Sequence, residues 1–460
     1  MKTIPVLVGS VALIGCGWAS ATWLHAETVA DEYTVSLEAL GQRHGVELVS
    51  LGYERSLMSS VARTEVHGGL AVSGYGDMLP EAWRKDSRVV LKHVIQHGPL
   101  VLEDGVEPLA ALVTTTLDLD HLNGVAASGV REACACEEPF RIVSRIQHDG
   151  SVTHEWDFMP LSWRDDIDGA PLSLSMGPID GTLSTSADAK VEARGSLGSV
   201  VADLGAFELN YKPTQWTYAG TVSDIPGIGE FEGQSDGLTL SVNGNDTVFR
   251  GVGFSSRNTV ENGVLGGVAR FGIKGVDGAT TLGPSSFSMT VRGLSADAVA
   301  QFNPKVSQMS LDTVAGRERF LAAYLALVQP GAGLGFDIHT ESTQGHSVEL
   351  TYDMAYAHDT GELATVGDLI GRIDGRLEAD LALTWLQDMG LERAIPTVQQ
   401  TAIVSGDHAT LTASLSGGQL TLNDQPFPLD VVFGAVLAQP LPTLSVIAEQ
   451  WRAAEQAGQR

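Results

Sequence analysis

The length, composition and charge of the chain bound what it can be. Its 460 residues allow one large domain or two to three ordinary ones, and 43% hydrophobic residues exclude wholesale disorder. With 28 Lys and Arg against 56 Asp and Glu, the net charge is −28, the opposite of the basic surface that nucleic-acid binding needs. Three cysteines exclude a disulfide scaffold, and 52 glycines with 18% charged residues favour a β-rich, turn-rich chain.

The acidic residues are spread along the chain rather than gathered in long runs, so no acidic tail is predicted. Such a charge promotes solubility and repels anionic lipid surfaces. It is typical of a generally acidic proteome, and it would also suit a surface that recruits a cationic partner. We expect no nucleic-acid partner.

Residues 1–26 predict a signal anchor or transmembrane helix. The run from Ile4 through Leu13 to Leu24 contains no ionisable side chain except Cys16. As a helix this run is about 32 Å long at about 1.5 Å per residue, and a hydrocarbon core is about 30 Å thick. The run is therefore long enough to span an inner membrane once and to anchor the chain there.

The flanks of this run indicate its orientation and leave two other fates open. Lys2 precedes it, and Trp18 and Trp23 lie near its far end, which fits a single-pass helix with the bulk of the chain in the periplasm. Alternatively, cleavage after residues 19–21 (ASA) would release a periplasmic protein. As a third fate, the residues before Cys16 resemble a lipobox, which would make the chain a lipoprotein attached through this cysteine.

Residues 27–45 predict a short amphipathic helix, and the sequence beyond them predicts strands. In the helix, Tyr33, Leu37 and Leu40 recur at helical spacing. From residue 46 onward apolar and polar positions alternate, as in strands that bury one face. The predicted strands lie within residues 46–67, 87–98, 182–197, 206–222, 236–258, 285–294, 335–356, 376–385 and 409–427.

Turn residues join several of these strands into antiparallel hairpins. Asn243-Gly244 and Gly417-Gly418 suit tight hairpin turns, and Gln344-Gly345 is a weaker candidate. Two helical zones interrupt the strands. Residues 296–328 carry apolar residues near helical spacing and are divided by proline and glycine, and residues 384–399 predict a shorter helix.

These elements predict a mainly β (α+β) fold. We expect one or more elongated, curved antiparallel sheets, a few covering helices and the N-terminal transmembrane helix. An internal boundary near residue 295 would separate a β-rich region, residues 27–295, from a helix-containing β-rich region, residues 296–460. A weak amphipathic helix is expected at residues 444–456.

Several phrases occur in a set order along the chain. They are residues 15–23 (GCGWASATW), 53–60 (YERSLMSS), 96–100 (QHGPL), 139–142 (PFRI) with 159–161 (MPL), and 418–424 (GQLTLND). In these phrases and their spacing the chain resembles the YdgA-like family of bacterial envelope proteins, a domain of unknown function (nine-four-five). The chain departs from the family pattern at two positions. Leu57 stands where a larger aromatic or a glycine-flanked residue is expected, and Asp424 stands where glycine is usual. The resemblance implies an inner-membrane-anchored periplasmic protein with no established enzyme activity and no catalytic set.

Four polar residues are weak candidates for a binding site. His97 precedes Gly98-Pro99, so it either contacts a ligand from a turn or packs where the Gly-Pro pair ends a strand. Asp118 and Asp120 would share one face of an extended segment, next to His121. That pair could hold a divalent cation or lie on a solvated strand edge or loop.

Two other patterns carry alternatives. Cys134 and Cys136 would lie about 6.7 Å apart in a straight strand, at the limit for a disulfide, so a mutual bridge needs a local turn. Their pairing is either structural or a redox or metal site. His148 and His154 flank the hairpin-turn candidate Asp149-Gly150 and could approach each other across a hairpin.

The chain lacks the common catalytic and metal motifs, including H-E-x-x-H, G-x-S-x-G and a calcium loop, so we expect no cofactor and no metal. Our first hypothesis is a non-enzymatic envelope protein whose apolar sheet face is either a packed core or a groove for an acyl chain or a partner strand. The alternative is a periplasmic hydrolase that uses the scattered Asp and His groups, which would then have to meet in one cleft. A third is a scaffold whose sheet edges pair with another protein.

Overall fold

The computed structural model describes residues 47–55, 59–67, 88–97, 101–102, 106–122, 124–167, 170–223, 225, 227–278, 281–300, 327–357 and 365–439. This part of the chain is mainly β, with antiparallel sheet and few helices, as the alternating pattern predicts. It forms two compact units. Unit 1 consists of the described residues within 1–222 and 231–248, and unit 2 consists of those within 223–230 and 249–460. Residues on both sides of the expected boundary near 295 belong to unit 2.

Several expectations lie outside the described residues. They are the anchor within residues 1–26, the helix at 27–45, most of the helical zone at 296–328 and the tail at 444–456. Within the described ranges, no helix is both long and apolar enough to cross a membrane. The helical zone also ends earlier than its pattern predicts, because Val328 already begins a strand.

Unit 1 begins as an antiparallel meander. Each strand pairs with the next one in the series β1 (Glu47–Arg55), β2 (Ser59–His67), β3 (Arg88–His97), β6 (Ala111–Leu117), β7 (Phe140–Ile146), β8 (Val152–Phe158), β11 (Ile179–Thr185), β12 (Lys190–Leu197) and β15 (Thr214–Thr221). A second series pairs β9 (Leu161–Ile167), β10 (Ala170–Met176), β13 (Val200–Asp203), β14 (Phe207–Tyr211) and β16 (Gly229–Val242).

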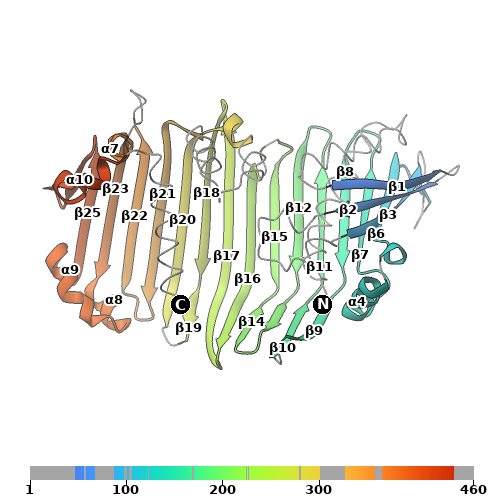
Figure 1. Ribbon diagram of the computed structural model, residues 1–460, viewed down its shortest axis with the longest axis horizontal. Helices are drawn as coiled ribbons and strands as arrows, with labels where there is room; N and C mark the ends of the chain where they lie inside the picture. Colours follow the sequence, from blue (N-terminus) through green and yellow to red (C-terminus); the bar gives the residue numbers. More distant parts are fainter. Residues whose placement is uncertain are drawn as a thin grey trace. The chain divides into compact units, whose positions relative to one another are not determined.

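The two series of unit 1 are halves of long hairpin arms that are interrupted at one line, which we call the crease (Figure 1). The crease consists of four two-residue breaks, Met159-Pro160, Gly177-Pro178, Gly198-Ser199 and Lys212-Pro213. Three of the breaks contain a proline. Proline has no N–H to donate to a neighbouring strand, so regular pairing stops at these positions. Phe158 and Leu161 lie three residues apart yet reach the same core, which a straight strand does not allow. The sheet therefore bends around its core at the crease.

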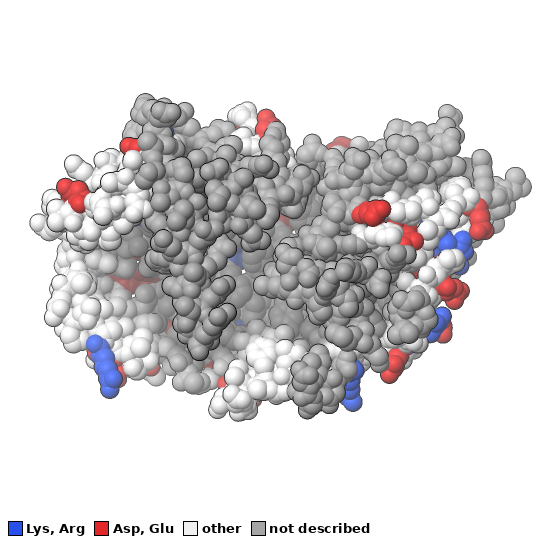
Figure 2. Space-filling model, viewed as in Figure 1, with Lys and Arg blue, Asp and Glu red and all other residues white. Residues whose placement is uncertain are grey.

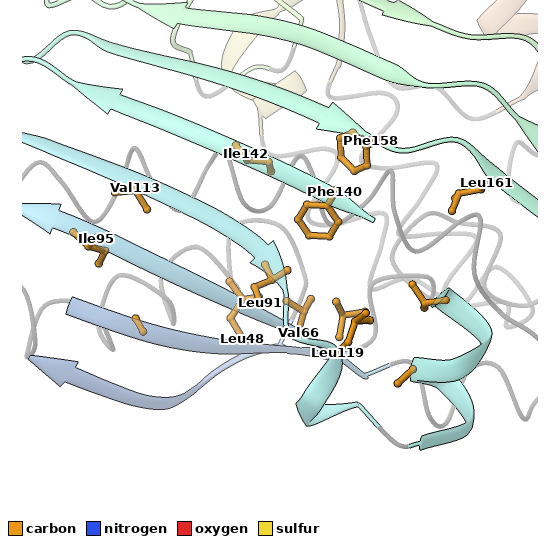
Figure 3. Close-up of a cluster of buried hydrophobic side chains, with 14 of the residues drawn as sticks. Leu48, Val66, Leu91, Ile95, Val113, Leu119, Phe140, Ile142, Phe158 and Leu161 are labelled. Carbon is orange, nitrogen blue, oxygen red and sulfur yellow. The ribbon is translucent and has the colours of Figure 1, made fainter. Parts of the chain in front are cut away.

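The main core of unit 1 lies on one face of β2, β3, β6, β7 and β8 (Figure 3). Phe140 and Phe158 pack on each other there, with ring centroids 5.3 Å apart. Between β6 and β7 the chain forms the 3₁₀ turn η3 (Leu119–His121) and helix α4 (Gly124–Cys134), whose Ala127 and Val130 are buried in this core. On the opposite face, the short hairpin of β4 (Val101–Leu102) and β5 (Val106–Glu107) brings Val101 into a smaller cluster with Leu109 and Leu112.

Two tryptophans of unit 1 lie flat on the sheet because the strands between them carry glycine. Trp156 on β8 lies opposite Gly181, and Trp216 on β15 lies opposite Gly195. A Cβ atom at Gly181 would approach the Trp156 ring to 2.5 Å, and one at Gly195 would approach the Trp216 ring to 2.7 Å. The two rings reach toward each other over these glycines, and their centroids are 6.1 Å apart.

Unit 2 is a second antiparallel meander. Its strands pair in the series β17 (Asn245–Glu261), β18 (Val264–Ile273), β20 (Leu282–Ser295), β21 (Val328–Ser342), β22 (Ser347–Tyr356), β23 (Ile373–Ala382), β25 (His408–Ser416), β26 (Gln419–Leu422) and β27 (Gln425–Phe427). Two short strands, β19 (Gly275–Asp277) and β24 (Ile403–Ser405), pair with β20 and β25.

Helices lie at both ends of β23 and β25 (Figure 1). They are α7 (Val366–Ile370) and α10 (Leu429–Leu437) at one end, and α8 (Leu383–Asp388), η4 (Glu392–Ala394) and α9 (Ile395–Thr401) at the other. The helix predicted at 384–399 is confirmed and is divided at Gly390, whose φ is +68°. The predicted turns are confirmed as well. Asn243 and Gly244 have φ of +51° and +77°, and Gly417 and Gly418 have φ of +53° and +77°, as type I′ turns require.

Candidate functional site

Asp118 belongs to a clasp of charged groups in unit 1. Its carboxylate accepts a hydrogen bond from Arg63 Nε at 2.9 Å and lies 3.0 Å from His121 Nδ1. Burial alone would raise the pKa of the Asp118 carboxyl, but the hydrogen bonds with His121 and Arg63 outweigh it, so the pKa lies below its ordinary value. The clasp ties strand β2 to the turn that leads into α4, which is a structural role.

The extended segment expected around Asp118 and Asp120 is wrong. Leu119–His121 is a 3₁₀ turn, so the two carboxylates do not share a face. Asp118 is 7% exposed, whereas the side chain of Asp120 is 88% exposed and faces Arg131 at 3.7 Å. Within the described residues no group of three or more His, Cys, Asp and Glu side chains could hold a metal ion.

The other histidine candidates do not gather at this clasp. Strand β3 ends at His97, whose side chain is outside the described part of the structure. His148 lies in the exposed turn between β7 and β8, and His154 lies opposite Ser144, so the expected approach of His148 to His154 is wrong. His154 is fully buried, and its Nδ1 is 2.7 Å from Ser144 Oγ.

Sequence reasoning did not single out His93, which is also fully buried in unit 1. Its two ring nitrogens lie 3.0 Å from Thr64 Oγ1 and 2.9 Å from Thr115 Oγ1, so a neutral ring can satisfy both hydroxyls. Burial lowers the pKa of His93 to about 3 and that of His154 to about 4. Both rings are therefore neutral and belong to the core. The sequence of β3 alone does not show that its polar residue His93 is buried.

Cys134 and Cys136 form a disulfide with their Cα atoms 5.1 Å apart. The local turn that a bridge requires is made by Ala135, whose φ of +51° is left-handed although the residue is not glycine. In the chain-entropy model a loop of about three residues stabilises by about 1.6 kcal/mol. A non-glycine residue in the left-handed region costs about 1–2 kcal/mol. The two terms cancel, so this disulfide contributes almost nothing to the stability of unit 1.

An apolar surface lies in unit 2, on one face of its sheet. In register across the strands, Phe254, Phe271, Phe287, Ile338, Leu350, Ala379 and Leu411 form one row, and Ala269, Met289, Phe336, Tyr352, Leu377 and Ala413 form the next. We call these two rows the apolar face. Ring centroids of Phe336 lie 5.8 Å from Phe287 and 6.1 Å from Tyr352, so the aromatic side chains are in contact.

The apolar face remains partly open. Phe254 and Phe271 are each 43% exposed, Ile338 is 39% and Phe287 is 37% exposed. By contrast, the row on the opposite face of the same strands is polar throughout and consists of Ser255, Arg270, Ser288, Asp337, Thr351, Glu378 and Thr412. Burying large hydrophobic side chains is favourable, so four of them left more than a third exposed in one row make this face a candidate binding surface.

The helices at one end of the strands pack beside the two rows of the apolar face. Leu383 and Leu386 of α8 are buried against Ala409 of β25, and Leu381 packs against the same cluster. The residues of β17, β18, β20 and β21 in the first row keep the exposure given above. The alternation of apolar residues in these strands was visible in sequence, but only the register aligns them into rows.

Charge does not single out a second site. Asp and Glu side chains lie at several separate places on the described surface, with Lys and Arg beside some of them (Figure 2). Several of the remaining histidines pair with a carboxylate, such as His346 with Asp388 at 2.7 Å and His408 with Asp380 at 2.8 Å. These pairs link hairpins and helices of unit 2, and the carboxylate of Asp388 also accepts a hydrogen bond from Ser342.

These features define a two-unit antiparallel β protein in which one sheet face is apolar and partly open. A sequence model of a protein family matches residues 1–430. The chain belongs to this family, which is described as bacterial protein of unknown function (DUF945), and the resemblance seen in the sequence is thereby confirmed. The comparisons with curated proteins and with solved structures found no match.

Proposed function

We propose that this chain is a non-enzymatic protein of the bacterial envelope that binds the acyl chain of a lipid on the apolar face of unit 2. The observation that carries the proposal is the row in which Phe254, Phe271, Phe287 and Ile338 follow one another across four paired strands, each more than a third exposed. A row of aliphatic and aromatic groups without charged members suits a hydrocarbon chain, which needs no hydrogen bonds.

The dimensions of the row fit this ligand. From Phe254 to Leu411 it crosses seven strands, which at about 4.8 Å for each of six spacings is about 29 Å. A bilayer core is about 30 Å thick and two acyl chains deep, so one chain is about 15 Å long. The row is thus long enough for one acyl chain lying across the strands over β17, β18, β20 and β21, where the exposure is greatest.

In this proposal residues 4–24 anchor the chain in the inner membrane as a single pass, and the two units lie in the periplasm. The length of the apolar run and the tryptophans at its far end support the anchor. A lipoprotein attached through Cys16 and a cleaved periplasmic protein remain the other two fates. Each of the three would bring the apolar face within reach of envelope lipids.

The hydrolase alternative receives less support from the described geometry. It requires the scattered Asp and His groups to meet, yet Asp118 is engaged by Arg63 and His121, and His154 is engaged by Ser144. Neither group is therefore available to a substrate.

The test is photo-crosslinking of the full chain in living bacteria. A photoreactive phenylalanine analogue is placed at Phe271 or at Ile338 on the apolar face, and at Leu204, which is 51% exposed in a turn of unit 1, as the matched control. We expect a lipid-sized mass adduct at the first two positions and none at the control. Adducts to protein only, or no adduct at Phe271 and Ile338, would contradict the proposal.

The binding strength provides a second measurement. Phe271 is 43% exposed, and a buried aromatic side chain removes about 200 Å² from water. Covering the exposed part contributes about 2 kcal/mol at about 25 cal/mol per Å². Phe271→Gln should therefore weaken lipid retention about 30-fold, whereas Leu204→Gln should leave it unchanged. Equal loss in both variants would point to a general effect on folding rather than to a ligand on the apolar face.

A further inference from the structure

The Cys134–Cys136 bridge is a feature that lipid binding leaves unexplained. It closes the C-terminal end of α4 in unit 1 and spans one intervening residue. Two features of this bridge are linked. The ring it closes is very small, and Ala135 inside that ring is held at a φ of +51°.

A structural role does not account for this bridge. A disulfide stabilises a fold chiefly by closing a long loop in the unfolded chain, and this loop is among the shortest that can be closed. The left-handed backbone of Ala135 opposes the bridged form, because a Cβ atom crowds the following carbonyl there. Helices that end in the left-handed region usually place glycine at this position, which would remove the opposition. This chain keeps alanine.

The bridge is also accessible. Ala135 is exposed, and Cys134 and Cys136 are both half-buried. Cys134 also packs against the main core of unit 1. The contact of Cys134 with the core leaves Cys136 as the cysteine for an incoming thiol to attack. We propose that Cys134 and Cys136 form a reversible thiol–disulfide exchange site whose substrate is a dithiol, either a small molecule or a pair of cysteines on another protein.

The exchange balances with the dithiol as the reductant. A thiolate of the dithiol attacks Sγ of Cys136, the Sγ–Sγ bond breaks, and its electron pair leaves on Cys134 Sγ, which then takes up a proton. The second thiol of the dithiol, as thiolate, attacks the sulfur bonded to Cys136 and releases Cys136 as a thiolate, which is protonated in turn. The two electrons thus pass from the dithiol, which becomes a disulfide, to the bridge. The reverse steps re-form the bridge.

The surroundings keep the opening local. Arg131 on the last turns of α4 donates to Glu137 at 2.7 Å, so an ion pair also connects the two sides of the bridge. Beyond them, Pro139 accepts a hydrogen bond from the Met159 backbone at 2.9 Å, and the ring of Phe140 is in the core. Reduction therefore releases the backbone of Ala135 without freeing the helix or strand β7.

The charge around the bridge selects among dithiols. Glu132, Glu137 and Glu138 are exposed on both sides of it. Like charges repel, so an anionic thiol such as glutathione should react more slowly than a neutral dithiol, and added salt should narrow the difference.

The experiment measures the redox equilibrium of the folded full chain. The protein is incubated with mixtures of reduced and oxidised dithiothreitol, its thiols are alkylated, and the peptide containing Cys134 and Cys136 is weighed by mass spectrometry. Two variants shift the equilibrium in opposite directions. Ala135→Gly removes the opposition to the left-handed backbone, so reduction should need about a tenfold higher ratio of reduced to oxidised dithiol, or about 30 mV. Ala135→Val should need a severalfold lower ratio, because a β-branched residue is less tolerant of positive φ.

The wild-type bridge should be reduced without denaturant, with the unfolding midpoint of the protein unchanged. A bridge that dithiothreitol reduces only in urea would overturn the proposal. The proposal would also be overturned if Ala135→Gly and Ala135→Val were half-reduced at the same ratio of reduced to oxidised dithiothreitol. The backbone of Ala135 would then not set the redox equilibrium of the bridge. Since neither variant touches unit 2, lipid crosslinking at Phe271 should be unaffected, so the two proposals stand or fall separately.

Discussion

Lowering the pH from 7 to 5 should destabilise unit 1 because two histidines are buried there as neutral rings. Burial lowers the pKa of His93 to about 3 and the pKa of His154 to about 4. In the unfolded chain both have a pKa of about 6.5. Between about pH 6.5 and pH 4 the two histidines therefore bind protons in the unfolded chain but not in the folded chain. The free energy of unfolding decreases as the pH falls through this range.

The magnitude follows from the width of this window. One pKa unit corresponds to about 1.4 kcal/mol, and pH 5 lies about 1.5 units below the unfolded value. Each histidine therefore removes about 2 kcal/mol of the free energy of unfolding by pH 5, and the two together remove about 4 kcal/mol. That is a large share of the about 5–15 kcal/mol by which domains are stable.

Hydrogen exchange measured by mass spectrometry can follow the loss of stability of unit 1 separately from that of unit 2. Peptides from β7 and β8 report the opening free energy of the strands that carry Ser144 and His154, after correction for the intrinsic pH dependence of exchange. The control is a His93→Gln, His154→Gln double variant, because glutamine can bond the same hydroxyls without titrating. Its opening free energy should change by about 4 kcal/mol less between pH 7 and 5 than that of the wild type.

Other charged groups, such as the pair of His67 with Glu65, are the same in both proteins, so their contributions cancel in this comparison. Where the double variant folds too weakly, His154→Gln alone should remove about half of the pH dependence. The same pH dependence in wild type and variants would refute the reasoning, and so would histidine ring resonances of His93 and His154 that shift between pH 7 and 5.

Two further changes test the backbone. Gly181→Ala should destabilise unit 1 by about 1–3 kcal/mol in urea unfolding, because the added Cβ would lie 2.5 Å from the Trp156 ring. The control is Gly375→Ala, which should have little effect because the atoms nearest to its added Cβ are 3.8 Å away. Asp424→Gly should stabilise unit 2 by about 1 kcal/mol, since Asp424 has a φ of +62° in the turn between β26 and β27; an unchanged unfolding midpoint would show that aspartate carries no strain there.

Much of the fold follows from local sequence signals. Alternation predicts many of the strands from residue 46 onward, but the predicted ranges leave out residues 99–181, where the structure forms β4 to β10. Asn243-Gly244 predicts a turn that the backbone adopts, because these two residue types tolerate the positive φ that the turn needs. Helix α4 was missed because its Gly- and Ala-rich sequence carries few large apolar residues at helical spacing. The run at 429–437, which is too short to span a membrane, folds as helix α10.

The candidate site depended more on contacts between distant residues. Nothing near Asp118 in sequence shows that Arg63, 55 residues earlier, supplies the charge that engages it. The register that aligns Phe271 with Phe287 is likewise set by pairing across strands, so periodicity predicts an apolar face but not its continuous rows. Sequence indicated which side chains share a face, and only the fold determined their neighbours.

The crease of unit 1 has a consequence for how its sheet finds one alignment. A strand rich in Ser, Thr and Gly can slide by two residues against its neighbour and still keep the same side chains on each face. At Met159-Pro160, Gly177-Pro178 and Lys212-Pro213 such a slide would push a proline into a position that needs an N–H donor. Because the breaks lie opposite one another, a shifted register is unfavourable for each pair of neighbouring strands. The prolines therefore select one register among several that have nearly equal hydrophobic energy.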